Sequence, residues 1–184
     1  MKKTTIIIAA IIMMAGFTTK SMAQGVTTGN ITAGAVIYTP IAITHTDGSG
    51  LYFGTLSVGA SGGNCVLSTA NVRTTTGDVN LGMTTESTVS NANFNVAGEG
   101  GQTYLVTFPT SITITAQGSS GGAPMTVDTW TVKCASAASD GFIGTIAALA
   151  PHNDTFKVGA TLHVNANQAS DAYSGTFNVT INYN

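Results

Sequence analysis

The sequence predicts an all-β protein, an antiparallel immunoglobulin-like β-sandwich of about nine strands. Short alternating or apolar runs recur along the chain, and clusters of Gly, Asn and Ser separate them. No segment after the first two dozen residues shows a sustained helical period, and the strong helix formers are scarce there. Alternation of this kind is expected when each strand buries one face and wets the other.

The first residues resemble a secretory signal peptide, so we expect the chain to be exported. Lys2 and Lys3 precede an apolar stretch over residues 4–17, and small residues follow it. Cleavage between Ala23 and Gln24 would leave residues 24–184 as one domain. A membrane anchor is the alternative, but the stretch is short for a bilayer span. The periplasm, the cell surface and the extracellular space are the expected locations.

Charge is sparse in the expected mature chain. Arg73, Lys133 and Lys157 would be its only cations against eight acidic residues, which gives a net charge of −5. So few cations do not neutralise a row of phosphates, which argues against nucleic acid or anionic lipid as a partner. The wet positions carry Thr, Ser, Asn and Gly, and such an uncharged surface offers little repulsion against self-association.

In the first half of the chain, strands are expected over residues 36–44, 51–56, 65–68 and 79–81. Pro40 interrupts the first of these runs, which predicts an edge strand or a bulge. A turn at 47–50 and a Gly-rich loop at 57–64 are expected between them.

In the second half, the runs at 92–97 and 103–108 predict a hairpin, because the tight Gly-rich connection at residues 98–101 follows the first run. Strands are also expected over 112–116, 125–134 and 155–164. The apolar phase of 125–134 switches midway, which predicts a bulge near Asp128. A bend is expected at Gly159.

The closing run alternates without interruption over its last twelve residues. One phase carries apolar residues and glycine, while Ser, Thr and Asn fill the other. This pattern predicts a long final strand with one dry face. The members of the dry phase are Tyr173, Gly175, Phe177, Val179, Ile181 and Tyr183.

Cys65 and Cys134 are the only cysteines. An even number in an exported chain favours a disulfide, which would stabilise the fold by about 4 kcal/mol in the chain-entropy model. Two separate buried thiols are the alternative.

Several stretches together resemble an uncharacterised family of secreted bacterial proteins, domain of unknown function 4402. They lie at residues 39–44, 51–56, 94–99, 104–109, 158–162 and 173–183. The resemblance implies a secreted β-sandwich with no assigned activity. The two cysteines are not part of the family pattern.

A looser similarity extends to pilin-type subunits and to spore-coat-like domains, in which a terminal strand of one molecule completes the sheet of the next. Residues 25–38 are the candidate donor segment here, with Ile31, Ala33, Ala35 and Ile37 in phase. The alternative is that this segment is simply the first strand or a leader.

Motifs for catalysis or metal binding are weak. His45, Asp47 and Ser49 are too close together around one turn to form a catalytic triad, and no spacing fits a zinc site. Asp47, Glu99 and Asp154 are possible calcium ligands, but turn chemistry explains them equally well. We therefore expect no enzymatic activity and no cofactor. His163 is expected at the surface.

The function that the sequence favours is that of a non-enzymatic structural or adhesive cell-surface protein, with strand addition between fimbrial-type subunits as one form. Self-association or a periplasmic chaperone would supply its partner. A secreted module that binds glycans or proteins is the alternative, and it predicts an exposed cluster of Trp130, Tyr52, Tyr104 and Tyr173. A small outer-membrane barrel is a distant alternative.

Overall fold

The computed structural model describes residues 28–46, 48, 50–82, 88–119 and 121–184. The chain divides into two units, Met1–Val36 and Ile37–Asn184. In the first unit, residues 28–36 are exposed and carry no regular secondary structure. The predicted leader, with Ala23 and Gln24, lies outside the described residues.

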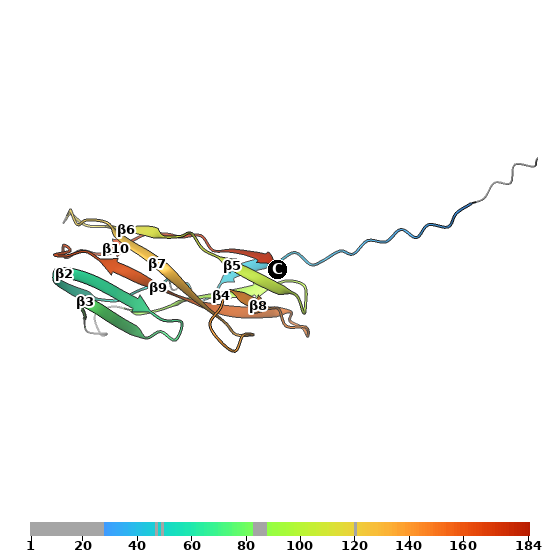
Figure 1. Cartoon of the computed structure of the whole chain (residues 1–184), viewed down its shortest axis with the longest axis horizontal. Helices are drawn as coiled ribbons and strands as arrows, with labels where there is room; N and C mark the ends of the chain where they lie inside the picture. The colour runs from blue at the N-terminus through green and yellow to red at the C-terminus, as the bar shows by residue number, and fades with distance from the viewer. Residues whose placement is uncertain (1–27, 47, 49, 83–87, 120) are drawn as a thin grey trace, which may run out of the picture. The chain divides into compact units, whose positions relative to one another are not determined.

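The second unit is all-β and antiparallel, and its described residues contain no helix (Figure 1). Its strands are β1 (Ala42–His45), β2 (Leu56–Leu67), β3 (Arg73–Leu81), β4 (Ala92–Ala97), β5 (Thr103–Thr107), β6 (Ile112–Ala116), β7 (Met125–Cys134), β8 (Ile143–Thr145), β9 (Asn153–Val164), β10 (Tyr173–Ser174) and β11 (Thr180–Tyr183).

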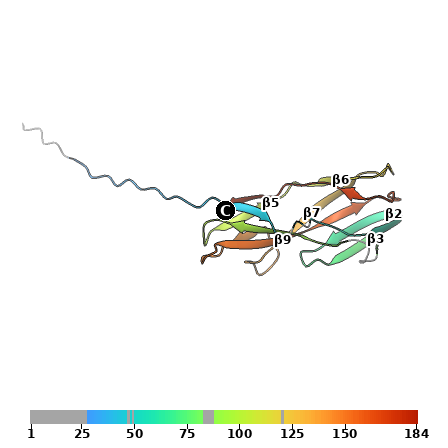
Figure 2. The same ribbon diagram turned by 180° about the vertical axis from the view of Figure 1, so that it is seen from behind.

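The larger sheet has eight strands and is built around β9. One edge of β9 pairs with β7 along most of its length, and the other edge pairs first with β4 and then with β2. The path through the sheet is β1-β4-β9-β7-β6-β10, and β3 joins it through β2. β7 and β9 can be followed across the body from either side (Figures 1 and 2).

The smaller sheet has three strands in the order β11-β5-β8. Tyr104 and Val106 of β5 point inward and meet Val96 of β4 and Phe156 of β9, and all four side chains are fully buried. The small sheet therefore covers one half of the large sheet and encloses the first of two hydrophobic clusters.

The second cluster lies along the other half of β9 and includes Leu162, Val127 of β7 and Leu67 of β2. Partly buried Trp130 packs against both clusters and joins them. β7 and β9 thus supply inward side chains to two adjoining cores.

Several expected elements differ from the structure. Residues 92–97 and 103–108 do not form a hairpin, because β4 pairs with β1 and β9 while β5 pairs with β8 and β11. Both runs aim their apolar phases at the same cluster from opposite sheets, so they face each other and do not pair edge to edge. Residues 51–55 contribute only an isolated bridge, from Tyr52 to Ser90.

The expected Gly-rich loop at 57–64 is also wrong, because β2 runs through it. Its pairing with β3 shifts register between Val58 and Gly63. A Cβ at Gly63 would lie only 2.1 Å from the carbonyl oxygen of Thr76, so glycine is required for the close approach of these two strands.

The predicted bulge in β7 is confirmed. Its pairing with β9 shifts register between Asp128 and Thr131, and Thr129 has a positive φ of 50°. An extra residue at this point turns Trp130 to the face that Val127 occupies before the bulge. The position of the expected edge strand 36–44 is also partly right, since β1 covers Ala42–His45 and, within the described part of the chain, pairs only with β4.

Candidate docking groove

The closing run changes sheets midway. Its first part, β10, pairs with β6 in the large sheet, and its last part, β11, pairs with β5 in the small sheet. Between them, Gly175–Val179 have no ladder partner and no backbone–backbone hydrogen bond among the residues that the structure describes. In the dry phase of this run Ile181 is buried, Gly175 is exposed and the other members are half-buried. The run is two short strands and not one long strand.

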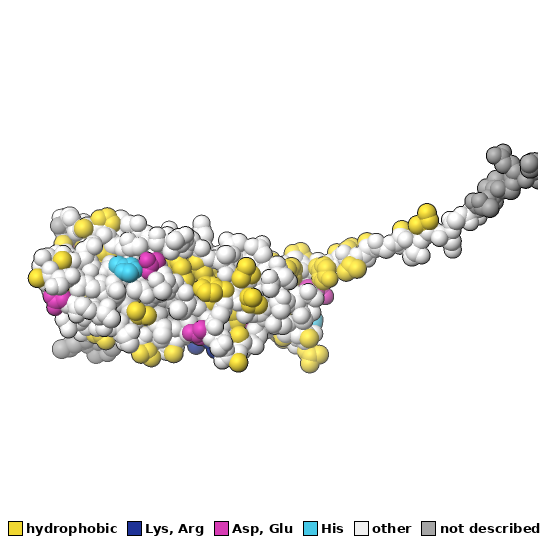
Figure 3. Space-filling model, in the orientation of Figure 1, with side chains coloured by type: hydrophobic (Ala, Val, Ile, Leu, Met, Phe, Trp, Pro, Cys, Tyr) yellow, Lys and Arg dark blue, Asp and Glu magenta, His cyan; other side chains and the backbone are white. Residues whose placement is uncertain are grey.

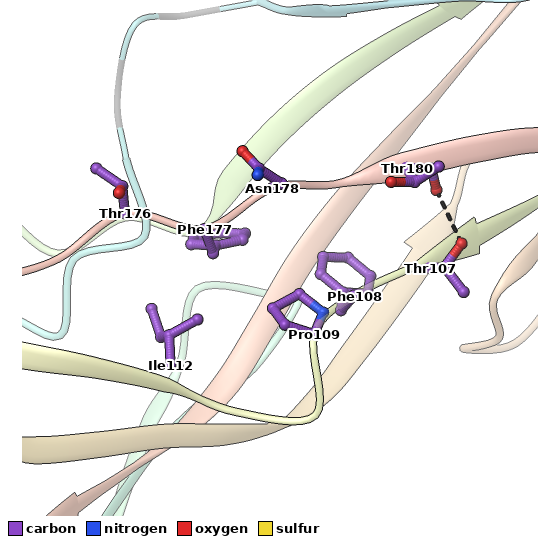
Figure 4. A pocket seen from close by; sticks show the side chains of 8 residues that line it. All are labelled: Thr107, Phe108, Pro109, Ile112, Thr176, Phe177, Asn178 and Thr180. Carbon is purple, nitrogen blue, oxygen red and sulfur yellow. Dashed lines mark hydrogen bonds between the residues drawn. The ribbon is translucent and has the colours of Figure 1, made fainter.

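The chain from β5 to β6 makes the same change of sheet in the opposite direction. A groove of about 500 Å³ lies where the two crossing segments separate. Figure 4 shows the segment from Thr107 to Ile112 on one side of it and the segment from Thr176 to Thr180 on the other. Its lining residues are Thr107, Phe108, Pro109, Ile112, Thr176, Phe177, Asn178 and Thr180.

Aromatic rings form the floor of this groove. Phe108 stacks on Trp130 with ring centroids 5.1 Å apart, and Phe177 lies 4.8 Å from Trp130 and 6.3 Å from Phe108. The indole N–H of Trp130 donates to the carbonyl oxygen of Pro109 at 2.8 Å. Since the rings and this hydrogen bond fix one another, the floor is preformed.

Further exposed apolar side chains lie on β5 and around the start of β8. The ring of Phe142 lies edge-on to the ring of Phe108, with centroids 6.2 Å apart, and Phe142 is 41% exposed. Leu105 and Ile143 are direct cross-strand partners on β5 and β8, and both are exposed. Hydrophobic side chains also gather over the middle of the face drawn in Figure 3, where charged ones are few. This surface has the composition of an interaction site.

The end of the closing run clamps the start of the second unit. The hydroxyl group of Tyr183 donates to the carbonyl oxygen of Thr39 at 2.6 Å and accepts from the backbone N–H of Glu99 at 2.7 Å. The carboxylate of Glu99 accepts from the backbone N–H of Thr39 at 3.0 Å and from its hydroxyl group at 2.9 Å. All three polar groups of Thr39 are therefore held.

The backbone hydrogen bond from Thr39, followed by the one from its hydroxyl group, lowers the pKa of Glu99 below its ordinary value. The carboxylate of Glu99 thus stays ionised at neutral pH, and the clamp stays intact. Glu99, considered above as a calcium ligand, spends one carboxylate oxygen on this clamp.

Asp154, another candidate calcium ligand, is buried in a network beneath the small sheet. One of its oxygens accepts from the hydroxyl groups of Tyr104 and Ser136, and the other from the backbone N–H groups of Ser136 and Thr155. Burial is the first cause that raises the pKa of Tyr104. Asp47 lies outside the described residues, and no group of three or more His, Cys, Asp or Glu within the described ranges is placed to hold a metal ion.

The expected disulfide is absent, because both cysteines are free and fully buried. Cys65 belongs to the second cluster and faces Leu162 of β9, while Cys134 belongs to the first and faces Phe156. Six residues of strand separate these two positions, roughly 20 Å, whereas a bridge needs Cα atoms within about 7 Å. Burial raises the pKa of both thiols.

The expected aromatic cluster for glycans does not assemble as such. Tyr104 is fully buried, Trp130 is partly buried under two phenylalanine rings, and Tyr52 is 53% exposed. The hydroxyl group of Tyr173 donates to the carbonyl oxygen of Ala169 at 2.8 Å. Sequence reasoning did not identify Phe108 and Phe177 as a site, although Pro109 marked the place where the ladder had to stop.

His163 lies at the surface as predicted, with its side chain 43% exposed. Its Nε2 atom is 2.7 Å from a carboxylate oxygen of Asp128, and its Nδ1 atom is 2.9 Å from the amide oxygen of Asn64. The hydrogen bond from His163 is the first cause that lowers the pKa of Asp128. Asp128, His163 and Asn64 thus join β7, β9 and β2 on the outer face of the large sheet.

Comparison with known protein families matches residues 41–183 to the domain of unknown function DUF4402. The match covers well over half of the chain, so the protein belongs to this family. Neither the curated proteins nor the solved structures give a significant match. No helix in the described parts of the chain is long and apolar enough to cross a membrane.

Proposed function

We propose that the protein is an exported, non-enzymatic structural component of the cell surface, a sandwich of immunoglobulin type that self-assembles by strand addition. In this proposal, residues 28–37 of one copy lie in the groove of the next. The observation that carries it is the stretch Gly175–Val179, which borders an apolar groove and has no ladder partner among the described residues.

Unpaired backbone beside an apolar groove favours an extended chain as the occupant. N–H and C=O groups that lack partners are a template for another strand, and the alternate side chains of that strand need pockets. Phe108, Ile112 and Phe177 supply apolar walls for such side chains. A strand added here would satisfy both requirements at once.

The segment before Thr39 has the properties of that occupant. Ile31 and Ile37 are 90% and 92% exposed, and they share a phase with Ala33 and Ala35. Small alanines between two isoleucines suit a narrow groove. Neither residues 28–37 nor the groove lining contains a charged side chain, so their association carries no cost of burying a charge.

The test measures the assembly state of a purified chain that begins at Gln24. Light scattering after size-exclusion chromatography and negative-stain electron microscopy report that state. We expect linear oligomers. Ala33→Asp puts a charge on the apolar phase and should abolish them, whereas Thr32→Asp puts the same charge on the other phase and should spare them.

Both variants change exposed residues outside any regular element, so folding is unaffected and each is the control of the other. A wild-type chain that remains monomeric at high concentration contradicts the proposal. Equal effects of Ala33→Asp and Thr32→Asp contradict strand addition, because a strand distinguishes its two phases.

A further inference from the structure

Two lysines stand side by side in a chain that otherwise avoids positive charge. Lys133 of β7 and Lys157 of β9 are direct cross-strand partners. Like charges directly opposite each other destabilise an antiparallel pair. Arg73, the other basic residue of the described ranges, is occupied by the carbonyl oxygens of Phe53 and Thr55. Neither lysine forms an ion pair with a described residue, so no negative charge in the described parts of the fold offsets their repulsion.

The lysines line a hollow of about 390 Å³ on the outer face of the large sheet. The loop after β2 and the loop after β7 form its other walls. Thr69, Ala70, Ala135, Asp140 and Thr155 complete the lining. Its volume falls in the range of about 300–1,000 Å³ that is usual for small-molecule sites. The hollow shares no residue with the docking groove.

The charged groups that line the hollow are the two lysines and the carboxylate of Asp140. The ammonium group of Lys133 is fixed by donation to the carbonyl oxygen of Ala137 at 2.8 Å. Lys157 makes no hydrogen bond or ion pair with any described residue. The carboxylate of Asp140 accepts from the hydroxyl group of buried Thr69 at 3.4 Å and forms no ion pair with either lysine.

A carboxylate and two ammonium groups that share a hollow without pairing leave room for a ligand between them. The ligand needs an anionic group for the lysines and hydrogen-bond donors for Asp140. It also needs groups that can both donate and accept, because Thr69 and Thr155 present hydroxyl groups. A sugar that carries a carboxylate meets all three requirements, since its acid and its hydroxyl groups lie on one ring.

We propose that this hollow binds a carboxylated sugar, with the carboxylate of the sugar between Lys133 and Lys157 and its hydroxyl groups toward Asp140. An acidic polysaccharide would present such units in series. Charge-assisted hydrogen bonds to two ammonium groups provide the affinity, and Asp140 discriminates against bare anions. The site is independent of strand addition, so either proposal can fail alone.

The experiment is an NMR titration of ¹⁵N-labelled chain from Gln24, carrying Ala33→Asp to keep it monomeric if it assembles. The probes are a short oligogalacturonate, the neutral oligogalactan, and inorganic sulfate. We expect the oligogalacturonate alone to shift the amides of Thr69, Lys133, Thr155 and Lys157 at low concentration, in a manner that added salt weakens.

Lys157→Gln removes the charge and leaves a shorter, uncharged polar side chain, so it should weaken binding about tenfold or more. Lys157→Arg keeps the charge and should retain most of the affinity. Asp140→Asn should strengthen the binding of sulfate, because it removes the nearby negative charge. Lys157 is exposed, so these variants are expected to fold, and the unfolding midpoint of Lys157→Gln should not fall.

Three results would overturn the proposal. The neutral oligomer could shift the same amides equally, sulfate could bind as tightly as the oligogalacturonate, or no probe could perturb the hollow. The first would remove the role of charge, the second would remove the recognition of a sugar, and the third would leave no site.

Discussion

Asp154 shows how a single buried carboxylate organises one end of the molecule. It is 7% exposed and accepts hydrogen bonds from Tyr104, Ser136 and Thr155. These donors come from β5, from the loop after β7 and from β9 itself. The buried charge is tolerated because both carboxylate oxygens of Asp154 accept hydrogen bonds from the donors around them.

Tyr104→Phe tests this network. The change removes one O–H donor from a buried charge and leaves the ring in place, so it should lower the free energy of unfolding by about 1.5–3 kcal/mol. Urea denaturation followed by Trp130 fluorescence measures it. Tyr52→Phe, at an exposed ring, is the matched control and should change stability by less than about 0.5 kcal/mol. Equal losses in the two variants would contradict the role of Asp154.

At the scale of elements, β9 depends on close contact with its neighbours at Gly159. A Cβ at this position would lie 2.3 Å from the carbonyl oxygen of Leu67 and 2.7 Å from the hydroxyl oxygen of Thr131. β9 pairs with β4 before this point and with β2 after it, so the two neighbours exchange places here. The backbone at the end of β2 occupies the space that a side chain would need.

Gly159→Ala should therefore destabilise the protein by about 1–3 kcal/mol, because backbone atoms cannot move aside as a flexible side chain can. Gly141→Ala is the control, since a Cβ there meets nothing within 4 Å, and it should be close to neutral. Thermal unfolding of the two variants distinguishes them. A neutral Gly159→Ala would show that the strands can separate at this point.

The sequence predicted which faces the strands bury better than it predicted their partners. Alternation placed Phe177, Ile181 and Tyr183 on the inner face, and the phase switch located the bulge near Asp128. Alternation carries no information about which strand lies alongside, so the hairpin of residues 92–108 was wrong. The groove was missed because Phe108, Trp130 and Phe177 meet only after two segments change sheets.

At the scale of the whole second unit, two hydrophobic clusters share β7, β9 and Trp130. Each cluster contains one fully buried thiol, Cys134 in the first and Cys65 in the second. Because β7 and β9 contribute side chains to both clusters, unfolding of one cluster removes packing partners from the other. The stabilities of the two clusters are therefore coupled.

The two thiols provide a direct measurement of this coupling. Labelling with a thiol reagent at increasing urea, read by mass spectrometry of peptides, should expose Cys65 and Cys134 at the same midpoint. In native buffer both should be almost unreactive, because burial raises their pKa and blocks access. Different midpoints would show that the halves unfold separately.

The clamp at Thr39 also has a mechanical consequence. A pull on the segment before it enters the folded body at Thr39, whose N–H, hydroxyl and carbonyl groups are bonded to Glu99 and Tyr183. The tension divides between the β4–β5 connection and the closing strand β11 before it reaches β1, a short edge strand that could otherwise peel off one hydrogen bond at a time. A joint of this kind loads several bonds in parallel, which is the geometry that resists extension.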